Sequence, residues 1–143
     1  MKLTCYIDTN IFLNVIYDEP LYARSSSSLF ERIQSGELAG ITSAVTETEV
    51  GLDLAKTGNL EKIDQALRLI ERMENLVICP LDSMAARMAV RLVLESGMTL
   101  HDAYHGATAI ENKASVFVTR DKFLGGKLKR MIRVSGPDVR AVG

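Results

Sequence analysis

Residues 3–14 read Leu3-Thr4-Cys5-Tyr6-Ile7-Asp8-Thr9-Asn10-Ile11-Phe12-Leu13-Asn14. A short apolar run rich in β-forming residues stops at Asp8, and the next two residues, Thr9 and Asn10, are favourable helix N-caps before a second apolar segment. The stretch therefore predicts a strand, then Asp8, then a helix. Ligands bind at the carboxyl ends of the strands in a parallel α/β sheet, so we expect Asp8 at the rim of a site. The alternative is a loop aspartate that only caps the helix.

The composition predicts a soluble protein. The chain has 143 residues, 47% of them hydrophobic, which is enough to bury a sizeable core, and we expect residues 1–143 to form a single domain. Its two cysteines, Cys5 and Cys79, fall in apolar runs that we predict to be strands, and two lone thiols suit a reducing cytosol. No apolar run approaches the roughly 18 residues of a membrane span, and the N-terminus lacks the apolar segment of a secretory signal. We therefore expect a cytoplasmic location and no membrane partner.

Strands and helices are expected to alternate along the rest of the chain. Strands are predicted at 38–42, 76–79, 115–118 and, as a short fifth, 131–134; helices are predicted at 21–35, from Ser43 to Gly58, from an Asn59 cap through Met73, from Asp82 to Gly97, and at 100–113. Strands that are apolar throughout and separated by helices indicate an α/β fold. Its sheet should be mainly parallel, with four to five strands, right-handed crossovers and both faces buried.

Three more acids are expected at the same edge of the sheet as Asp8. Asp121 also ends a predicted strand, while Glu49 and Asp102 lie in the early turns of helices that follow loops, so all four are expected at one sheet edge. Each acid alone has a structural explanation as a helix cap or a first-turn charge. Gathered carboxylates repel one another unless a cation is present, and oxygen-only ligands favour Mg²⁺ or Mn²⁺. Such ions commonly activate water and stabilise the leaving oxygen in phosphodiester hydrolysis.

A second metal interpretation involves His101 and His105, which lie four residues apart on one predicted helix face, as zinc ligands often do. The segment lacks the glutamate of an HExxH motif, and the chain has no third histidine. A zinc site is therefore the less favoured interpretation. The favoured one is that these histidines lie at the surface or support another ligand.

Charge is distributed unevenly along the chain. Residues 1–119 contain 10 Lys and Arg against 16 Asp and Glu, a net charge of −6, whereas residues 120–143 contain seven against two, a net charge of +5. This basic section could hold a phosphate backbone; a solvated polar surface is the alternative. The candidate RNA-binding residues are Arg120, Lys122, Lys127, Lys129 and Arg130.

Four segments carry a resemblance to a known family: Ile7-Asp8-Thr9-Asn10, Ile41-Thr42-Ser43-Ala44-Val45-Thr46-Glu47-Thr48-Glu49, Asp102-Ala103-Tyr104-His105-Gly106-Ala107-Thr108-Ala109-Ile110, and Val116-Phe117-Val118-Thr119-Arg120-Asp121. In this order they span essentially the whole chain. The chain resembles PIN-domain proteins, and specifically the small toxin ribonucleases of prokaryotic VapBC toxin–antitoxin pairs.

The resemblance implies a three-layer α/β/α sandwich and endonucleolytic cleavage of RNA with Mg²⁺ or Mn²⁺. It places Asp8, Glu49, Asp102 and Asp121 in the family's metal-binding and catalytic positions, with Asn10 and Thr119 as polar support. Glu47 is a possible confusion, but Glu49 has the family's spacing from Thr46. Phe123 is a departure, because it follows Asp121 by two residues where the family often has three, and Gly125-Gly126 follows closely.

The resemblance also implies partners. We expect a cognate antitoxin whose peptide blocks the acidic pocket, and a homodimer to which helix 21–35 offers Tyr22, Leu29 and Phe30. The alternatives are a PIN nuclease of RNA processing or quality control that needs no antitoxin, and a non-catalytic RNA-binding module. The module is disfavoured because all four acids are present.

Overall fold

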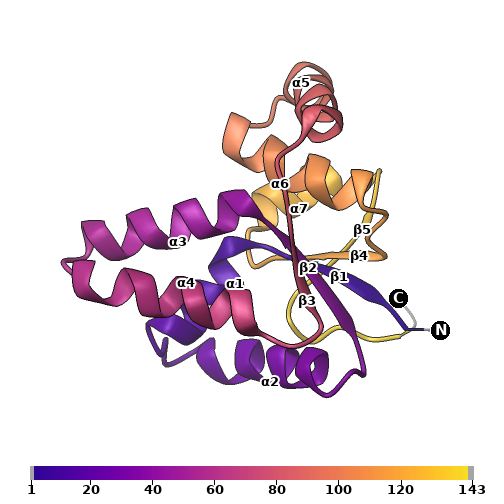
Figure 1. The fold of residues 1–143 in the computed structure, drawn as a ribbon. Coiled ribbons are helices and arrows are strands. Elements are labelled where there is room, and N and C mark those ends of the chain that lie inside the picture. Colours follow the sequence, from indigo (N-terminus) through magenta and orange to yellow (C-terminus); the bar gives the residue numbers. More distant parts are fainter. Residues whose placement is uncertain (1, 142–143) are drawn as a thin grey trace.

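The computed structural model describes residues 2–141 and shows a five-stranded sheet covered by helices on both faces (Figure 1). The strands are β1 (Thr4–Ile7), β2 (Ala39–Ser43), β3 (Leu76–Cys79), β4 (Val116–Val118) and β5 (Arg133–Ser135). The helices are α1 (Thr9–Ile16), α2 (Ala23–Gln34), α3 (Ala44–Lys56), α4 (Ile63–Arg72), α5 (Ser83–Ser96), α6 (Leu100–Glu111) and α7 (Lys122–Leu128), with a 3-10 turn at Leu60–Lys62. None of these helices is long and apolar enough to cross a membrane.

Strand order explains where a site can form. The order is β3-β2-β1-β4-β5, and every neighbouring pair is parallel, as the apolar strands predicted. The chain builds outward from β1 to β3 and then returns to place β4 on the other side of β1. The backbone N–H of Asp8 donates to the carbonyl of Val118 at 3.0 Å, so the ends of β1 and β4 are joined at this switch point. In open α/β sheets this crevice is the usual place for a ligand.

The strands divide the core into two layers, because successive side chains point to opposite faces. Cys5 and Ile7 pack with the apolar side chains of α1 to α4, whereas Tyr6 packs with those of α5, α6 and α7. Figure 1 shows α2 and α4 on one side of the sheet and α5, α6 and α7 on the other. The expected three-layer α/β/α sandwich is therefore confirmed.

One helix was not predicted from the sequence. α7 is only seven residues long and contains Gly125 and Gly126, which weaken a helix. It forms because the side chain of Asp121 caps its N-terminus while Leu124 and Leu128 fill the core. Burial of this kind overrides a weak local propensity.

Two smaller expectations were wrong. Asn59 makes no side-chain cap to the next helix; its amide donates to the carbonyl of Thr57, and the 3-10 turn precedes α4. Leu29 and Phe30, which were expected to offer a surface for dimerisation, are buried in the core, while Tyr22 is 43% exposed. α2 therefore has less apolar surface to offer a second copy than its sequence suggested.

Candidate active site

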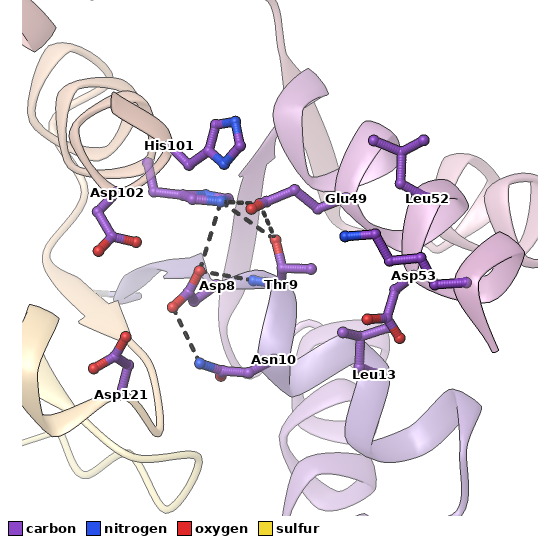
Figure 2. Close-up of a pocket in the computed structure, with 12 residues that line it drawn as sticks. Asp8, Thr9, Asn10, Leu13, Glu49, Leu52, Asp53, His101, Asp102 and Asp121 are labelled. Carbon is purple, nitrogen blue, oxygen red and sulfur yellow. Dashed lines mark hydrogen bonds and ion pairs between the residues drawn. The ribbon is translucent and has the colours of Figure 1, made fainter. Parts of the chain in front are cut away.

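The four predicted acids line one cavity of about 340 Å³ at the carboxyl end of the sheet. They come from the end of β1, from α3, from α6 and from the loop after β4. In Figure 2 the carboxylates of Asp102 and Asp121 point toward Asp8 from one side, and Glu49 lies on the other. The cavity is also lined by Thr9, Asn10, Leu13, Leu52, Asp53, Lys56, His101 and His105.

Asp8 is held rigidly. It is only 5% exposed and is the N-cap of α1, with Oδ1 accepting from the backbone N–H of Thr9 at 2.8 Å. Its Oδ2 accepts from the Thr119 hydroxyl at 2.7 Å and from the Asn10 amide at 3.2 Å. The carboxylate thus has fixed donors on both oxygens, so its orientation toward the cavity is set before any ligand arrives.

Asn10 and Thr119 join the two loops that carry Asp8 and Asp121. The Asn10 amide donates to the Thr119 hydroxyl oxygen at 3.2 Å, and its carbonyl accepts from the backbone N–H of Arg120 at 3.2 Å. The Thr119 hydroxyl oxygen also accepts from the backbone N–H of Asp121 at 2.9 Å. Asn10 and Thr119 therefore orient Asp8 and join it to the loop that carries Asp121.

Glu49 is paired with His105, a contact that was not predicted. The Nε2 atom of His105 lies against Glu49 Oε1, and the Thr9 hydroxyl donates to the same oxygen at 2.7 Å. On the other side of the ring, Nδ1 lies 2.6 Å from the hydroxyl of the fully buried Tyr6. His105 thus holds Glu49 in place from inside the core, while His101 is exposed on the cavity wall.

This pairing shifts both titrations. Burial alone would raise the pKa of Glu49, but the hydrogen bond and the charge of His105 outweigh it and lower that pKa. Burial alone would lower the pKa of His105, but the hydrogen bond to Glu49 and the charge of Asp8 raise it. The two directions favour an ionised Glu49 beside a protonated His105.

Asp102 and Asp121 complete the acidic wall. Asp121 caps α7, with Oδ1 accepting from the backbone N–H groups of Phe123 and Leu124, each at 3.0 Å. Asp102 lies in the first turn of α6, which Thr99 caps through the Asp102 backbone N–H at 3.3 Å. Burial, followed by the charges of Asp8 and Asp121, raises the pKa of the Asp102 carboxyl. The three carboxylates therefore repel one another across the cavity.

The structure separates Glu49 from Glu47. Glu47 does not line the cavity; it interacts with Glu71, and burial together with that neighbour raises the pKa of Glu47 to about 7. The assignment by spacing from Thr46 therefore selects the glutamate that faces the other acids.

The donor set suits a divalent cation, although no cage is prebuilt. Across residues 2–141, no three His, Cys, Asp or Glu side chains already stand close enough together to hold a metal ion. The cavity is nevertheless lined by carboxylate oxygens, which are the ligands that a hard cation prefers. Such a cation would also relieve the repulsion that contributes to the raised pKa of Asp102. Asp8, Glu49, Asp102 and Asp121 fit such an ion by their chemistry.

The basic candidates differ in their surroundings. Arg120 is engaged within the fold: its guanidinium donates to Asn14 Oδ1 at 2.6 Å and to Ser25 Oγ at 2.6 Å, and it lies 4.4 Å from the centre of the Tyr22 ring. The Lys127 ammonium donates to the carbonyl of Gly97 at 2.8 Å. The other three candidates are exposed on or just after α7: Lys122, Lys129 and Arg130. Lys56, which the sequence did not single out, adds a positive charge to the cavity wall.

The order of these residues along the chain can be compared with known proteins. The family model described as PIN domain matches residues 5–124, which include all four acids. The chain belongs to the PIN domain family. The resemblance seen in the sequence is thus confirmed, and the cavity described here is that of a PIN domain. A comparison with curated protein sequences gave no match.

Solved structures with the same fold include components of toxin–antitoxin complexes. A toxin–antitoxin complex from Klebsiella pneumoniae contains a chain 21% identical to this PIN domain, with 93% of this chain and 97% of that chain covered and a TM-score of 0.67. The DNA-bound VapBC complex of Salmonella typhimurium gives 18% identity, 94% and 98% coverage and a TM-score of 0.71. VapBC2 of Rickettsia felis, bound to a promoter DNA fragment, gives 18% identity, the same coverage and a TM-score of 0.70. At these identities the likeness establishes the fold.

Proposed function

We propose that this PIN-domain protein is a metal-dependent endoribonuclease of the VapC toxin type, acting in the cytoplasm. The observation that carries the proposal is that Asp8, Glu49, Asp102 and Asp121 line one cavity at the switch point of the sheet. The family assignment and the toxin–antitoxin neighbours support the same class of activity.

We propose Mg²⁺ or Mn²⁺ as the cofactor, held by the four carboxylates. When bound, such an ion supplies an activated water and offsets the negative charge of the phosphodiester. The protein's own part is to fix these ligands: Asp8 through Thr119 and Asn10, and Glu49 through His105 and Thr9. No side chain is required as a nucleophile.

We propose that the RNA backbone reaches this acidic cavity along the exposed cations Lys122, Lys129 and Arg130. Their charge offsets repulsion between the phosphates and the acidic body of the protein. Arg120 and Lys127 were also candidates on sequence grounds, and their contacts within the fold position the loop before α7 and α7 itself.

The direct test is cleavage of single-stranded RNA by the purified protein in Mg²⁺, in Mn²⁺ and in EDTA. We expect cleavage only with metal, and loss of cleavage for Asp8→Asn. The matched control is Glu47→Gln, which removes a carboxylate from the start of α3 but outside the cavity and should cleave as the wild type does. Full activity of a folded Asp8→Asn protein, or cleavage in EDTA, would overturn the proposed mechanism.

We further propose a cognate antitoxin as a protein partner, because the solved neighbours come from complexes with one. The distinguishing test is co-purification with the product of a small adjacent reading frame, followed by loss of RNA cleavage in the complex. A nuclease of RNA processing without an antitoxin would have no such partner and would remain active in every preparation.

Self-association is also proposed. α5 exposes Met84, Val90 and Leu94, and the neighbouring edge strand exposes Val77, so apolar surface is available on this side of the molecule. Sedimentation at tens of micromolar should show a dimer; a monomer at that concentration would contradict the proposal.

A further inference from the structure

Phe123 is placed unlike the other phenylalanines. It is 71% exposed, whereas Phe12, Phe30 and Phe117 are at most 5% exposed. The next residue, Leu124, is 1% exposed and fills the core of α7. The apolar residue that follows Asp121 by three positions is therefore the one that packs, and Phe123 adds an exposed ring that the fold does not use.

The main chain of Phe123 adjoins the acidic cavity through Asp121, which lines that cavity. The backbone N–H of Phe123 donates to Asp121 Oδ1 at 3.0 Å, so residue 123 directly adjoins one of the four carboxylates. The Lys127 ammonium lies 4.2 Å from the ring centre and donates to the carbonyl of Gly97 at 2.8 Å. Because Gly97 lies in the turn that leads into α6, the ring is on the side of α7 that faces the start of the Asp102 helix.

Lys127 also restrains the ring. Its ammonium donates a hydrogen bond to the Gly97 carbonyl and also lies over the Phe123 ring, in the geometry of a cation–π contact. A restrained ring loses less conformational entropy when a planar ligand stacks on it. The exposure of 71% shows that most of the Phe123 surface stays open despite this contact.

The charges around the ring indicate what stacks there. Lys122 and Lys129 are exposed on and just after the same short helix, and they attract a polyanion rather than an apolar protein segment. Single-stranded nucleic acids are bound by this combination of cations for the backbone and an aromatic ring for the base. We infer that Phe123 is a stacking platform for a nucleobase of single-stranded RNA next to the cleaved phosphodiester, with Lys127 holding the ring and Lys122 contacting a phosphate.

This inference rests on the proposed ribonuclease function but can be tested without catalysis. The chain contains no tryptophan, so Phe123→Trp gives a single tryptophan, whose emission reports on the platform. In EDTA, a short single-stranded RNA should quench this tryptophan saturably, whereas inorganic polyphosphate, which has the charge but no bases, should not. The control is Leu69→Trp, at a position that is 63% exposed on α4, across the sheet from α7, and RNA should leave its emission unchanged. Equal emission changes at both positions, or none at Phe123→Trp, would overturn the inference.

Kinetics provide the second measurement. Phe123→Leu keeps an apolar side chain but removes the π-surface, and its KM for RNA should rise about 5- to 150-fold, the range expected for one lost stacking contact, with a much smaller change in kcat. Phe123→Tyr should restore KM, and Mn²⁺ affinity and Tm should match the wild type in both variants. An unchanged KM for Phe123→Leu in an enzyme that cleaves RNA contradicts the stacking role alone. Lack of cleavage by the wild type contradicts the proposed function, and the fluorescence titration then still decides the stacking role. Loss of antitoxin binding with RNA binding intact would reassign the ring to a protein interface.

Discussion

Replacing Asp102 by Asn should stabilise the metal-free protein. The Asp102 carboxyl has a raised pKa because it is partly buried and faces the charges of Asp8 and Asp121, so its ionised form is disfavoured in the folded state. Relief from two such neighbours is worth on the order of 1 kcal/mol each at the dielectric of a partly exposed site. Losing a first-turn charge costs about 0.3–1 kcal/mol of helix-dipole interaction. The cap from Thr99 is unaffected because it binds the main chain of residue 102.

The net expectation is about 1 kcal/mol of added stability, or about 2–4 °C in Tm for a chain of this size. The matched variant is Asp8→Asn, which removes the same charge from the same cavity. It should melt lower than the wild type, because the new amide donor would face the Thr119 hydroxyl and the Asn10 amide, at a cost of about 1–3 kcal/mol. Counting charges alone would give both variants the same sign.

Thermal unfolding followed by circular dichroism in EDTA and in Mn²⁺ measures these effects. Mn²⁺ should raise the Tm of the wild type by ligand linkage, and it should raise the Tm of Asp102→Asn by less. The difference in Tm between the two proteins should therefore shrink or change sign when Mn²⁺ is added. The reasoning is refuted if Asp102→Asn melts below the wild type in EDTA and Mn²⁺ shifts neither protein, since Asp102 would then act only as a helix-start charge.

Three further predictions concern the surroundings of the site. Arg120→Ala should lower the free energy of unfolding by about 1.5–3 kcal/mol, because it loses hydrogen bonds to α1 and α2. If instead the dependence of RNA affinity on salt becomes shallower by about 1 in slope, Arg120 contacts a phosphate. Tyr6→Phe should cost about 1–3 kcal/mol in chemical denaturation because it leaves the buried ring nitrogen of His105 unsatisfied, and a stability equal to the wild type would contradict this. Burial and Glu71 raise the pKa of Glu47 to about 7, so the folded state holds this proton more tightly than the unfolded state, and stability should fall as pH rises from about 4.5 through 7. Glu47→Gln should remove that fall when Tm is measured across this pH range. If the variant and the wild type give parallel curves, the Glu47–Glu71 pair is not the cause.

Local patterns were sufficient wherever the decisive contacts are close in sequence. The β1–Asp8–α1 unit was predicted because an apolar strand, an acid and an apolar helix follow one another directly, although the N-cap is Asp8 itself and not Thr9 or Asn10. Glu49 was preferred to Glu47 because the resemblance implies its spacing from Thr46, and Glu49 is the one of the two that lines the cavity. The helix α7 was missed because its stability comes from Leu124 and Leu128 in the core and not from its own propensity.

The contacts that fix the site could not be predicted in the same way. His105 is separated by 99 residues from Tyr6 and by 56 from Glu49, and only the completed sheet brings the three together. Its neighbour His101, on the same helix, is exposed, so helical spacing alone could not distinguish them. Arg120 likewise forms its hydrogen bonds with Ser25 and Ser26, 95 and 94 residues away. The sequence near Arg120 does not reveal these serine partners. Arg120 was therefore interpreted as a phosphate contact.

The strand order also has a consequence during synthesis of the chain. β1 emerges first and occupies the centre of the sheet, but the residues of its second neighbour, β4, lie 111 positions further along the chain than the residues of β1 with which they pair. A nascent chain that has emerged only through β3 has one edge of β1 unpaired and has neither Thr119 to orient Asp8 nor Asp121 to complete the acidic wall. Long-range pairing of this kind forms late in folding. The carboxylate cavity therefore assembles only after nearly all of the polypeptide has left the ribosome, so a partly synthesised chain lacks the complete site of the proposed ribonuclease.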